Sequence, residues 1–252
     1  MNPAALSPPA AAVISGSGLA VVPRGLTVEA EEEYATIGWP TTGVAGHPNR
    51  LLRARTRSGG VVYLAFGRPH PYEGWSEPEL ARPIEDLAAR GARLLVLTCA
   101  AGGLAATATP GSVVVVDAVV DLQTRPPDEG RLVAATAPPL APRAVAAFRP
   151  HLPVARGRYA AVWGPQYETP AEAAWLAGLA DVVGMSGAPE LRAATRLGLD
   201  VIMLAALVNR AGHAVGHADL LQAGGRLSRG LRLGLARLLG LVRAPHDDPG
   251  DD

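Results

Sequence analysis

The sequence predicts an α/β fold: a single domain whose central, mostly parallel mixed sheet is flanked by helices. Short apolar runs alternate with amphipathic stretches along most of the 252 residues, which is the pattern of strands alternating with helices. Several runs are apolar throughout, as expected of strands covered on both faces. The length is close to the upper limit for one core. We expect one domain over residues 11–243, with disordered tails at 1–10 and 244–252.

Seven short apolar runs are expected to form strands, and four stretches are expected to form helices. The expected strands are Ala12–Ser15, Val61–Phe66, Arg93–Thr98, Val113–Val120, Tyr159–Trp163, Asp181–Gly184 and Val201–Leu207. Ser76 and Glu79 form a capping box that begins the first helix, and Gly91 ends it. Thr169 begins the second helix in the same way, with a proline at its first position. The other two helices are expected at residues 186–197 and 217–241.

Composition excludes several classes of protein. The 23 basic residues balance 23 acidic ones, and all the basic residues are arginines. A neutral chain without a basic tract argues against nucleic-acid or membrane partners. The absence of lysine excludes Schiff-base catalysis, and the single cysteine excludes a disulfide framework or a cysteine zinc cluster. No apolar run is long enough to span a membrane and no signal peptide is evident, so we expect a cytoplasmic protein.

Four segments that follow expected strands carry polar or small residues, at the edge where open α/β sheets bind ligands. The first, around Ser17, can bring backbone N–H groups and a hydroxyl to an anion, or can form a plain tight turn. The second joins Arg68, His70, Tyr72 and Glu73. Its arginine and histidine suit a phosphate, although a solvated turn with a surface ion pair would show the same residues.

The other two segments are individually weaker. Residues 98–104 are small and leave room for a flat or anionic group against the backbone, or they form a glycine-rich strand exit. In residues 164–169, Tyr167 can stack on a ring and Glu168 can accept its N–H groups. A simpler interpretation makes Glu168 a carboxylate that stabilises the start of a helix.

Taken together and in order, these motifs resemble the trimeric purine nucleoside phosphorylase family, including its relatives that act on methylthioadenosine. The resemblance covers residues 13 to about 225. The matching blocks are Gly16–Leu19, Gly46–Leu51, Gly67–Gly74, Ala100–Leu104, Gly164–Thr169, Val183–Ser186 with Pro189 and Glu190, Leu207–Asn209, and Gly216–Asp219. The resemblance implies the nucleoside phosphorylase fold and a homotrimer. It also implies a reaction in which inorganic phosphate is the co-substrate. Phosphate attacks the anomeric carbon of a purine nucleoside, and the products are the free base and a pentose 1-phosphate.

The resemblance assigns a role to each polar residue. Asn209, His70 and Glu168 are the implied catalytic residues. The implied phosphate site consists of Ser17, His47, Arg68, His70, the backbone of Ala100, and Ser186. The implied nucleoside site consists of Tyr72, Ala101, Gly102, Tyr167, Glu168, Val183, Met185, Asn209 and His217. No metal and no cofactor are expected.

The chemistry of the bases makes these roles specific. Cleavage of the glycosidic bond builds negative charge on the departing purine, and Asn209 can donate to purine N7 as that charge develops. Ionised Glu168 can accept the N1–H of a 6-oxopurine, a proton that adenine lacks. A hydrogen bond of this charged kind contributes about 1.5–3 kcal/mol. Glutamate with asparagine therefore favours inosine and guanosine, whereas adenine-preferring relatives carry aspartate at position 209.

Several positions depart from the family pattern or leave alternatives open. Cys99 and Val208 replace residues that are usually polar, and either can alter contacts with the base. Residues 121–143 are rich in proline and are expected to form a loop that lacks the family's capping phenylalanine. His213 competes with His217 for the 5′-hydroxyl, and Met185 can equally be core packing. A zinc site that joins the two histidines to Asp219 has matching spacing alone.

Two further functions remain open on the sequence. A methylthioadenosine or other modified-nucleoside phosphorylase would fit the departures at Cys99 and Val208. A nucleoside-binding homologue with weakened catalysis would fit the divergent residues 121–143, although the central polar residues are all retained.

Overall fold

The computed structural model describes residues 10–123, 131–213 and 216–240. In these ranges every predicted strand and helix occurs in the predicted order, and four strands or α-helices that the sequence did not predict occur at residues 26–33, 50–56, 131–134 and 141–148. The strands are β1 (Ala10–Ser15), β2 (Leu26–Glu33), β3 (Arg50–Thr56), β4 (Val61–Phe66), β5 (Leu94–Gly103), β6 (Val113–Asp121), β7 (Arg131–Ala134), β8 (Val154–Ala161), β9 (Val182–Gly184) and β10 (Asp200–Arg210). The helices are α1 (Glu77–Ala89), α2 (Ala141–Phe148), α3 (Pro170–Leu176), α4 (Ala188–Arg196) and α5 (His217–Leu238), with a 3₁₀ turn at Pro71–Glu73.

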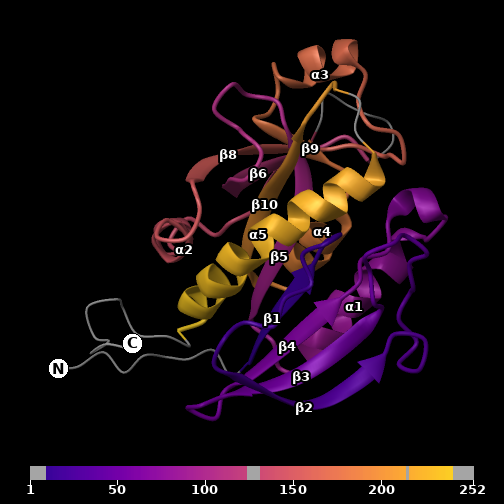
Figure 1. Ribbon diagram of the computed structural model, residues 1–252. Helices are drawn as coiled ribbons and strands as arrows, with labels where there is room; N and C mark the ends of the chain where they lie inside the picture. Colours follow the sequence, from indigo (N-terminus) through magenta and orange to yellow (C-terminus); the bar gives the residue numbers. More distant parts are fainter. Residues whose placement is uncertain (1–9, 124–130, 214–215, 241–252) are drawn as a thin grey trace.

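The strands form one mixed sheet that closes partly on itself. Strand β1 pairs in parallel with β4 and β5, and β5 pairs in parallel with β10. From β10 the sheet continues antiparallel to β6, then parallel through β8 to β9, and β9 returns antiparallel to the end of β5. Strands β5, β10, β6, β8 and β9 therefore form a closed ring, and β1, β4, β3 and β2 extend from it (Figure 1).

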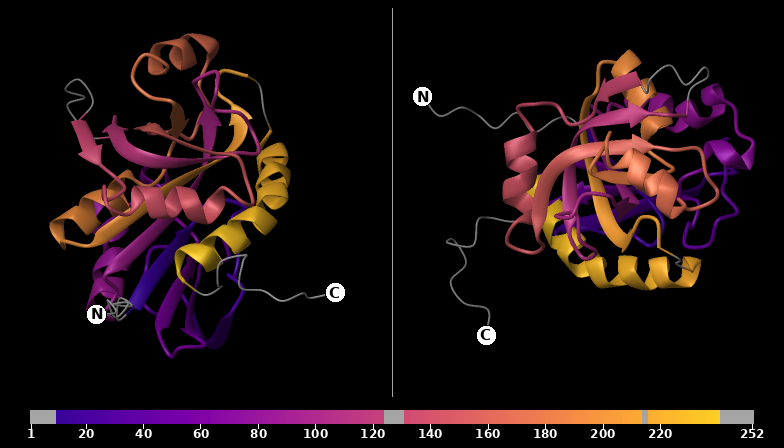
Figure 2. Two further views of the ribbon diagram at one scale, coloured as in Figure 1. Left: turned by 90° about the vertical axis from the view of Figure 1, so that its left-hand side faces the viewer. Right: turned by 90° about the horizontal axis from the view of Figure 1, so that it is seen from above.

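Helices cover the sheet on two sides. Leucine and alanine side chains of α1 and α4 pack with the β1, β4 and β5 residues of one core cluster. Phe148 and the other buried residues of α2 pack with α5 against the opposite face. The two views of Figure 2 show α2 beside α5 and away from α1. This layering places the carboxyl ends of the parallel strands at one end of the sheet, where ligands bind in such folds.

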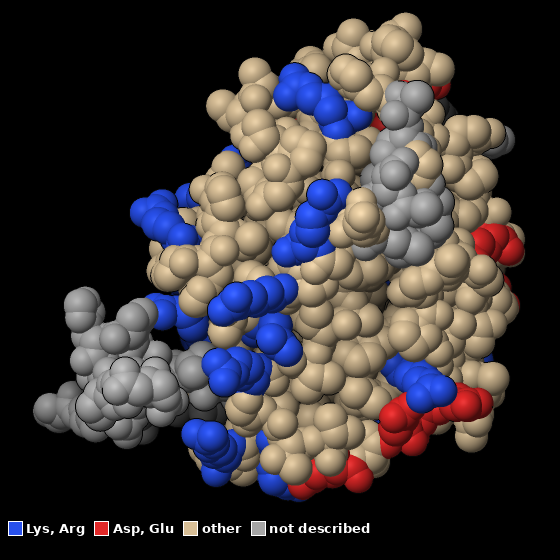
Figure 3. All heavy atoms as spheres, viewed as in Figure 1, with Lys and Arg blue, Asp and Glu red and all other residues tan. Residues whose placement is uncertain are grey.

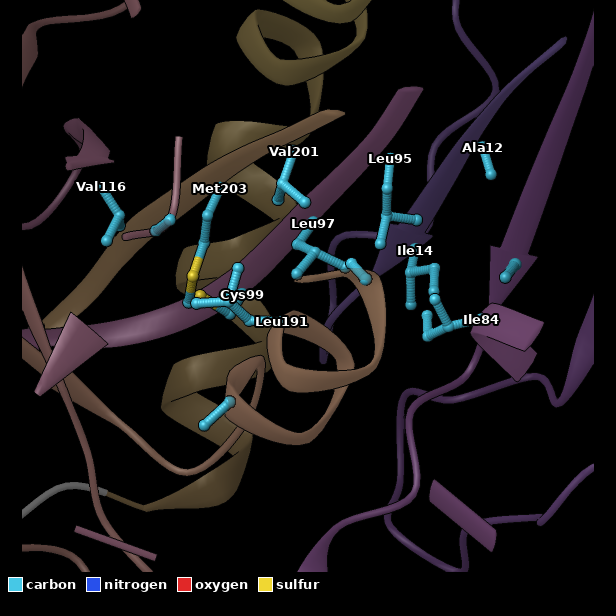
Figure 4. Packing of buried hydrophobic residues seen from close by; sticks show 14 of the residues in the cluster. Ala12, Ile14, Ile84, Leu95, Leu97, Cys99, Val116, Leu191, Val201 and Met203 are labelled. Carbon is cyan, nitrogen blue, oxygen red and sulfur yellow. The ribbon is translucent and has the colours of Figure 1, made fainter. Parts of the chain in front are cut away.

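The lone cysteine belongs to the core and not to a ligand site. Cys99 is fully buried on β5 and contacts the cluster that contains Leu97, Leu191 and Met203 (Figure 4). Its thiol lies 3.6 Å from the Leu204 carbonyl, and burial raises its pKa to about 11. The expectation that Cys99 can alter base contacts is therefore wrong, because its side chain points away from the ligand-binding edge into the packing against α4.

The predicted fold class is confirmed, and the helix signals act as expected. The Ser76–Glu79 capping box begins α1, and Gly91, at φ +95°, follows its end. The Thr169 side chain accepts a hydrogen bond from Glu172 N at the start of α3. Helix α5 begins at His217 as predicted and ends at Leu238, a little before residue 241. Strand β1 begins two residues before the expected start at Ala12, at Ala10, which the sequence assigns to the tail; residues 1–9 and 241–252 lie outside the described ranges.

The loop expected over residues 121–143 is the main error in the fold. Strand β6 runs to Asp121, β7 occupies part of the segment, and α2 begins at Ala141. Pro142 is tolerated there because the first turn of a helix does not use that N–H. Residues 124–130 lie outside the described part of the chain. Of the prolines in this segment, Pro142 therefore marks a helix start, whereas Pro138 and Pro139 lie in a turn, so the loop prediction is wrong only in part.

Charge is distributed unevenly although its sum is zero. Arg226, Arg229 and Arg232 are exposed on α5. Figure 3 shows arginines gathered over this helix, whereas the acidic side chains of this face lie mainly toward its lower edge. Within the described ranges, no helix has both the length and the apolar character needed to cross a membrane.

Candidate active site

A cavity of about 380 Å³ opens at the carboxyl ends of the parallel strands. Most residues proposed from the sequence line it, although they come from six separate strands or the segments that follow them. These are Ser17, His70, Tyr72, Ala100, Ala101, Gly102, Tyr167, Glu168, Val183, Met185, Ser186 and Asn209. Residues far apart in the sequence therefore converge because their strands end at the same edge.

One end of the cavity is built to receive an anion. His47 Nδ1 accepts the backbone N–H of Arg68 at 3.1 Å, so the neutral ring carries its proton on Nε2. That Nε2 lies 2.7 Å from Ser17 Oγ and donates to it. The Ser17 hydroxyl hydrogen then remains available to a ligand in the cavity. His47 itself stands behind the lining residues and acts on the cavity through Ser17.

His70 and Glu73 form a second polar unit at this end. Glu73 accepts hydrogen bonds from His70 N at 2.8 Å, from Thr42 Oγ1 at 2.7 Å and from Gly43 N at 3.1 Å, and its Oε2 lies 3.1 Å from His70 Nδ1. Burial alone would raise the pKa of Glu73, but these donors hold it at about 2. The carboxylate therefore fixes the His70 ring, which stacks on Tyr72 at 4.8 Å between centroids.

Arg68 lies directly behind the anion end. Its guanidinium is 1% exposed, and Nε lies 2.6 Å from Glu190 Oε1. Its remaining nitrogens donate to the carbonyls of Thr98 and Ile14, and Nη1 lies 3.4 Å from Ser186 Oγ. Arg68 is thus connected to the cavity through Ser186 and is not itself among the lining residues. Its direct contact with phosphate stays a prediction.

The opposite end suits a planar base. Glu168 lines the cavity, and burial is the main cause that raises its pKa, with a smaller contribution from Glu172. Tyr167 is 38% exposed beside it. Across the cavity Asn209, near the end of β10, donates from Nδ2 to the Arg210 carbonyl at 3.1 Å. A carboxylate, an aromatic ring and an amide therefore line the same cavity.

Small residues make this region accessible. A Cβ at Gly16 would lie 3.0 Å from the Thr98 carbonyl oxygen and 3.0 Å from Cys99 Cα, so the turn after β1 approaches β5 closely. A Cβ at Gly102 would lie 3.4 Å from Asn209 Oδ1. Strand β5 continues through Ala100, Ala101 and Gly102, so these residues present backbone and small side chains to the cavity from within the sheet.

Met185 closes the side between the two ends. It lines the cavity and lies against Gly164, where a Cβ would come within 2.5 Å of its Sδ and 2.9 Å of the Tyr72 ring. Of the two interpretations of Met185, the cavity wall is the one that the geometry supports. Val44 and Ala45 complete the lining on the side of Ser17 and His70.

Some expectations fall on residues whose side chains the structure does not describe. His217 is the first residue of α5, but its side chain lies outside the description. His213 is exposed, with Nδ1 3.2 Å from the Ala211 carbonyl. Among the described residues no cluster of three or more histidine, cysteine, aspartate or glutamate side chains could hold a metal. The choice between His213 and His217 stays a prediction.

The sequence analysis missed several lining residues and one buried partner. Val44, Ala45, Pro165 and Gly184 line the cavity without polar chemistry that could mark them. Glu190 appeared only as part of a matching block, although it is the partner of Arg68. The sequence feature that could have marked Glu190 is its place in the first turn of a helix that begins two residues after Ser186. The structure shows that this glutamate is buried. Val208 lines the cavity, so its effect on contacts with the base stays a prediction.

Comparisons with known proteins agree with this geometry. The sequence profile of the Phosphorylase superfamily matches residues 11–232. The chain is 38% identical over 221 residues to a purine nucleoside phosphorylase of Mycobacterium leprae, covering 84% of this chain and 82% of the relative. It is 30% identical to purine nucleoside phosphorylase 1 of Bacillus subtilis, covering 81% of this chain and 80% of that protein.

Solved structures give the same result. Isoform 2 of the Schistosoma mansoni purine nucleoside phosphorylase, in complex with cytosine and ribose-1-phosphate, superposes with a TM-score of 0.78 at 28% identity and covers 92% of this chain and 90% of its own. The Schistosoma mansoni enzyme in complex with inosine gives a TM-score of 0.76 at 26% identity over 97% and 92% of the two chains. The chain belongs to the purine nucleoside phosphorylase family of pentosyltransferases.

Proposed function

We propose that this enzyme cleaves 6-oxopurine nucleosides, inosine and guanosine, with inorganic phosphate. The observation that carries the proposal is that Glu168 and Asn209 line the same cavity as Ser17, His70 and Ser186. Groups that could accept a base and groups that could hold an anion therefore line one space the size of a nucleoside site. Relatives in complex with inosine and with hypoxanthine support the substrate class.

In the proposed reaction, an oxygen of hydrogen phosphate attacks the anomeric carbon as the bond from that carbon to purine N9 breaks. The electron pair of that bond moves onto the purine, and the proton of hydrogen phosphate ends on the released base. Asn209 donates to N7 and stabilises the charge that develops there. Ionised Glu168 accepts N1–H, while Ser17, His70, Ser186 and the Ala100 N–H hold the phosphate. The products are the free base and a pentose 1-phosphate.

Phosphate dependence is the experiment that tests this proposal. Purified enzyme with inosine and phosphate should release hypoxanthine, and the rate should fall to background when phosphate is removed. Guanosine should react similarly, whereas adenosine and methylthioadenosine should react much more slowly because they lack N1–H. Equal cleavage without phosphate would make the enzyme a nucleosidase. A preference for methylthioadenosine would assign it to that branch of the family.

We further propose that the enzyme is a cytoplasmic homotrimer that needs no cofactor or metal. The site supports the absence of a metal, because its anion end is composed of hydroxyl, imidazole and backbone donors, which suffice for a phosphate without a cation. Activity retained after dialysis against a chelator would support the proposal, and activity restored only by added metal would overturn it.

A further inference from the structure

The dipeptide Met185–Ser186 belongs to both ends of the active site. Met185 forms the side wall of the nucleoside region, and Ser186 stands beside Arg68 at the anion end. Both residues follow β9, a strand of only three residues. A strand that short fixes the following backbone poorly, so other groups must hold the two peptide units in place.

Two buried side chains do this, one on β8 and one just past the end of β6. Gln123, directly beyond the end of β6, donates from Nε2 to the Met185 carbonyl at 3.0 Å and to the Val162 carbonyl at 2.8 Å. Tyr159, on β8, donates from its hydroxyl to the Ser186 carbonyl at 3.0 Å, and the oxygen of that hydroxyl lies 3.4 Å from Ser186 N. Each residue of the dipeptide is therefore held by one buried side chain. We call the contacts of Gln123 with the Met185 and Val162 carbonyls the Gln123 clamp, and those of Tyr159 with Ser186 the Tyr159 clamp.

The Gln123 clamp lies where two strands separate. Strands β8 and β9 pair as far as Ala161 and Gly184, and Val162 N donates once more to the Gly184 carbonyl. Beyond this point β8 leads toward Tyr167 and Glu168, while β9 leads to Met185. The Gln123 carboxamide donates to both of these segments. It therefore fixes the distance between the segment that leads to Tyr167 and Glu168 and the segment that carries Met185.

Gln123 is itself held rigidly. It is 6% exposed, and its backbone N–H donates to Asp121 Oδ1 at 3.0 Å. The other oxygen of this buried aspartate pairs with Arg192 of α4, and Arg192 Nε reaches Glu77 of α1 at 2.8 Å. The clamp is thus anchored to both helices that cover this side of the sheet.

The Tyr159 clamp is equally tight. The side chain is fully buried, and burial raises the pKa of its hydroxyl well above the ordinary value, so the hydroxyl stays protonated and donates. A Cβ at Gly184 would lie 2.3 Å from the Tyr159 hydroxyl. Only glycine at that position lets the phenol approach the Ser186 peptide.

We propose that Gln123 and Tyr159 are separate positioning residues: Gln123 sets the nucleoside wall through Met185, and Tyr159 sets the phosphate contact through Ser186. The proposal rests on the proposed function for the identity of the two ligands. It assigns a role to Gln123, which lies in the 121–143 segment that departs from the family pattern.

The test is a crossed pair of substitutions. Gln123→Met keeps the side-chain length and removes both donors, so KM for inosine should rise by about five- to tenfold, the factor that one net hydrogen bond contributes. KM for phosphate should stay unchanged. Tyr159→Phe should raise KM for phosphate by a similar factor and leave KM for inosine unchanged. Gln222→Met, the same substitution at an exposed glutamine of α5, should change neither constant.

The outcomes separate this proposal from the proposed function. If both substitutions raise both constants equally, or neither constant changes, the two-clamp proposal is overturned. Thermal midpoints identify a variant that does not fold, in which case Gln123→Asn, with a shorter carboxamide, must show the same selective rise. Calorimetry measures the binding of inosine and of phosphate without turnover. Gln123→Met should weaken the binding of inosine selectively, and Tyr159→Phe should weaken the binding of phosphate selectively. Failure of the unaltered enzyme to use phosphate would overturn the proposed function instead.

Discussion

Glu168 determines base preference through its protonation state, which gives a prediction in pH. Burial raises the pKa of its carboxyl, so the ionised form accumulates only above that raised value. Only the ionised form accepts the N1–H of a 6-oxopurine. The preference for inosine over adenosine should therefore be full well above the raised pKa and should decline as pH falls through it, at a higher pH than for an exposed glutamate.

The ratio of kcat/KM for inosine to that for adenosine, measured across pH, checks this prediction. Taking the ratio cancels the titration of phosphate, which is common to both reactions. Glu168→Gln should lower the ratio and remove its dependence on pH, while Glu85→Gln, at an exposed position of α1, serves as the control. If the ratio declined equally with falling pH in the Glu168→Gln variant, a group other than Glu168 would determine the base preference.

At the scale of single residues, the sequence predicted polar chemistry better than the direction of side chains. Ser17, His70 and Glu168 carry functional groups that mark them, and all line the cavity. Cys99 was misplaced because strand β5 continues further than its apolar run suggested. Side chains alternate along a strand, so the length of β5 decides which face each residue meets.

At the scale of elements, α4 contributes a charge that the interior cannot leave unpaired. Glu190 in its first turn lies 2.6 Å from Arg68, and both side chains are buried. Removing one partner of a buried pair typically costs about 3–5 kcal/mol, because the other charge stays uncompensated. Glu190→Gln should therefore lower the free energy of unfolding by an amount of this order, measured by urea denaturation.

An exposed ion pair supplies the control for that substitution. Glu31 pairs with Arg50 across β2 and β3, where both side chains are more than 40% exposed. Glu31→Gln should change stability little, because solvent screens such pairs. If the two substitutions had equal effects, the Arg68–Glu190 pair would not be the buried charge pair described above.

The glycines of α5 test how this helix packs. A Cβ at Gly234 would come within 2.2 Å of the Phe148 ring of α2, whereas a Cβ at Gly225 would meet nothing within 4 Å. Gly234→Ala should destabilise the fold by about 1–3 kcal/mol through overpacking. Gly225→Ala should stabilise it by up to about 1 kcal/mol, because alanine has less entropy to lose in a helix. Equal shifts in the thermal midpoint would contradict the close packing of α2 on α5.

The elements that the sequence missed lack the signals on which prediction depends. Strand β2 is partly or fully exposed along its whole length, so it shows no apolar run. Cross-strand ion pairs from Glu29 and Glu31 to arginines of β3 contribute to its edge instead. Strand β7 is short, and α2 begins among prolines. Elements whose stability comes from neighbouring strands and helices cannot be found from local pattern alone.

At the scale of the molecule, closure of the sheet explains why one site gathers residues from so many strands. Glycines 102 and 103 allow β5 to leave β1 and pair with β9, which completes the ring. A Cβ at Gly103 would lie 2.0 Å from the Ala108 carbonyl oxygen, so no larger residue fits there. Ala100 and Ala101, which precede these glycines on β5, line the cavity. Fold closure and ligand access therefore depend on one short glycine segment.

The surface near α3 leads to the last prediction, which concerns assembly. Trp175 of α3 is 61% exposed and Trp163, beyond β8, is 50% exposed. Exposed aromatic side chains of this size are typical of surfaces that bind another protein.

We expect a homotrimer of about 78 kDa, three times the 25.9 kDa of one chain, in light scattering across a dilution series. Trp175→Arg should lower that mass, because a charge on this surface opposes burial. Val28→Arg, on β2 at the other end of the molecule (Figure 1), should leave it unchanged. A monomer at micromolar concentration, or equal effects of both substitutions, would overturn the assignment of this surface to the contact between copies.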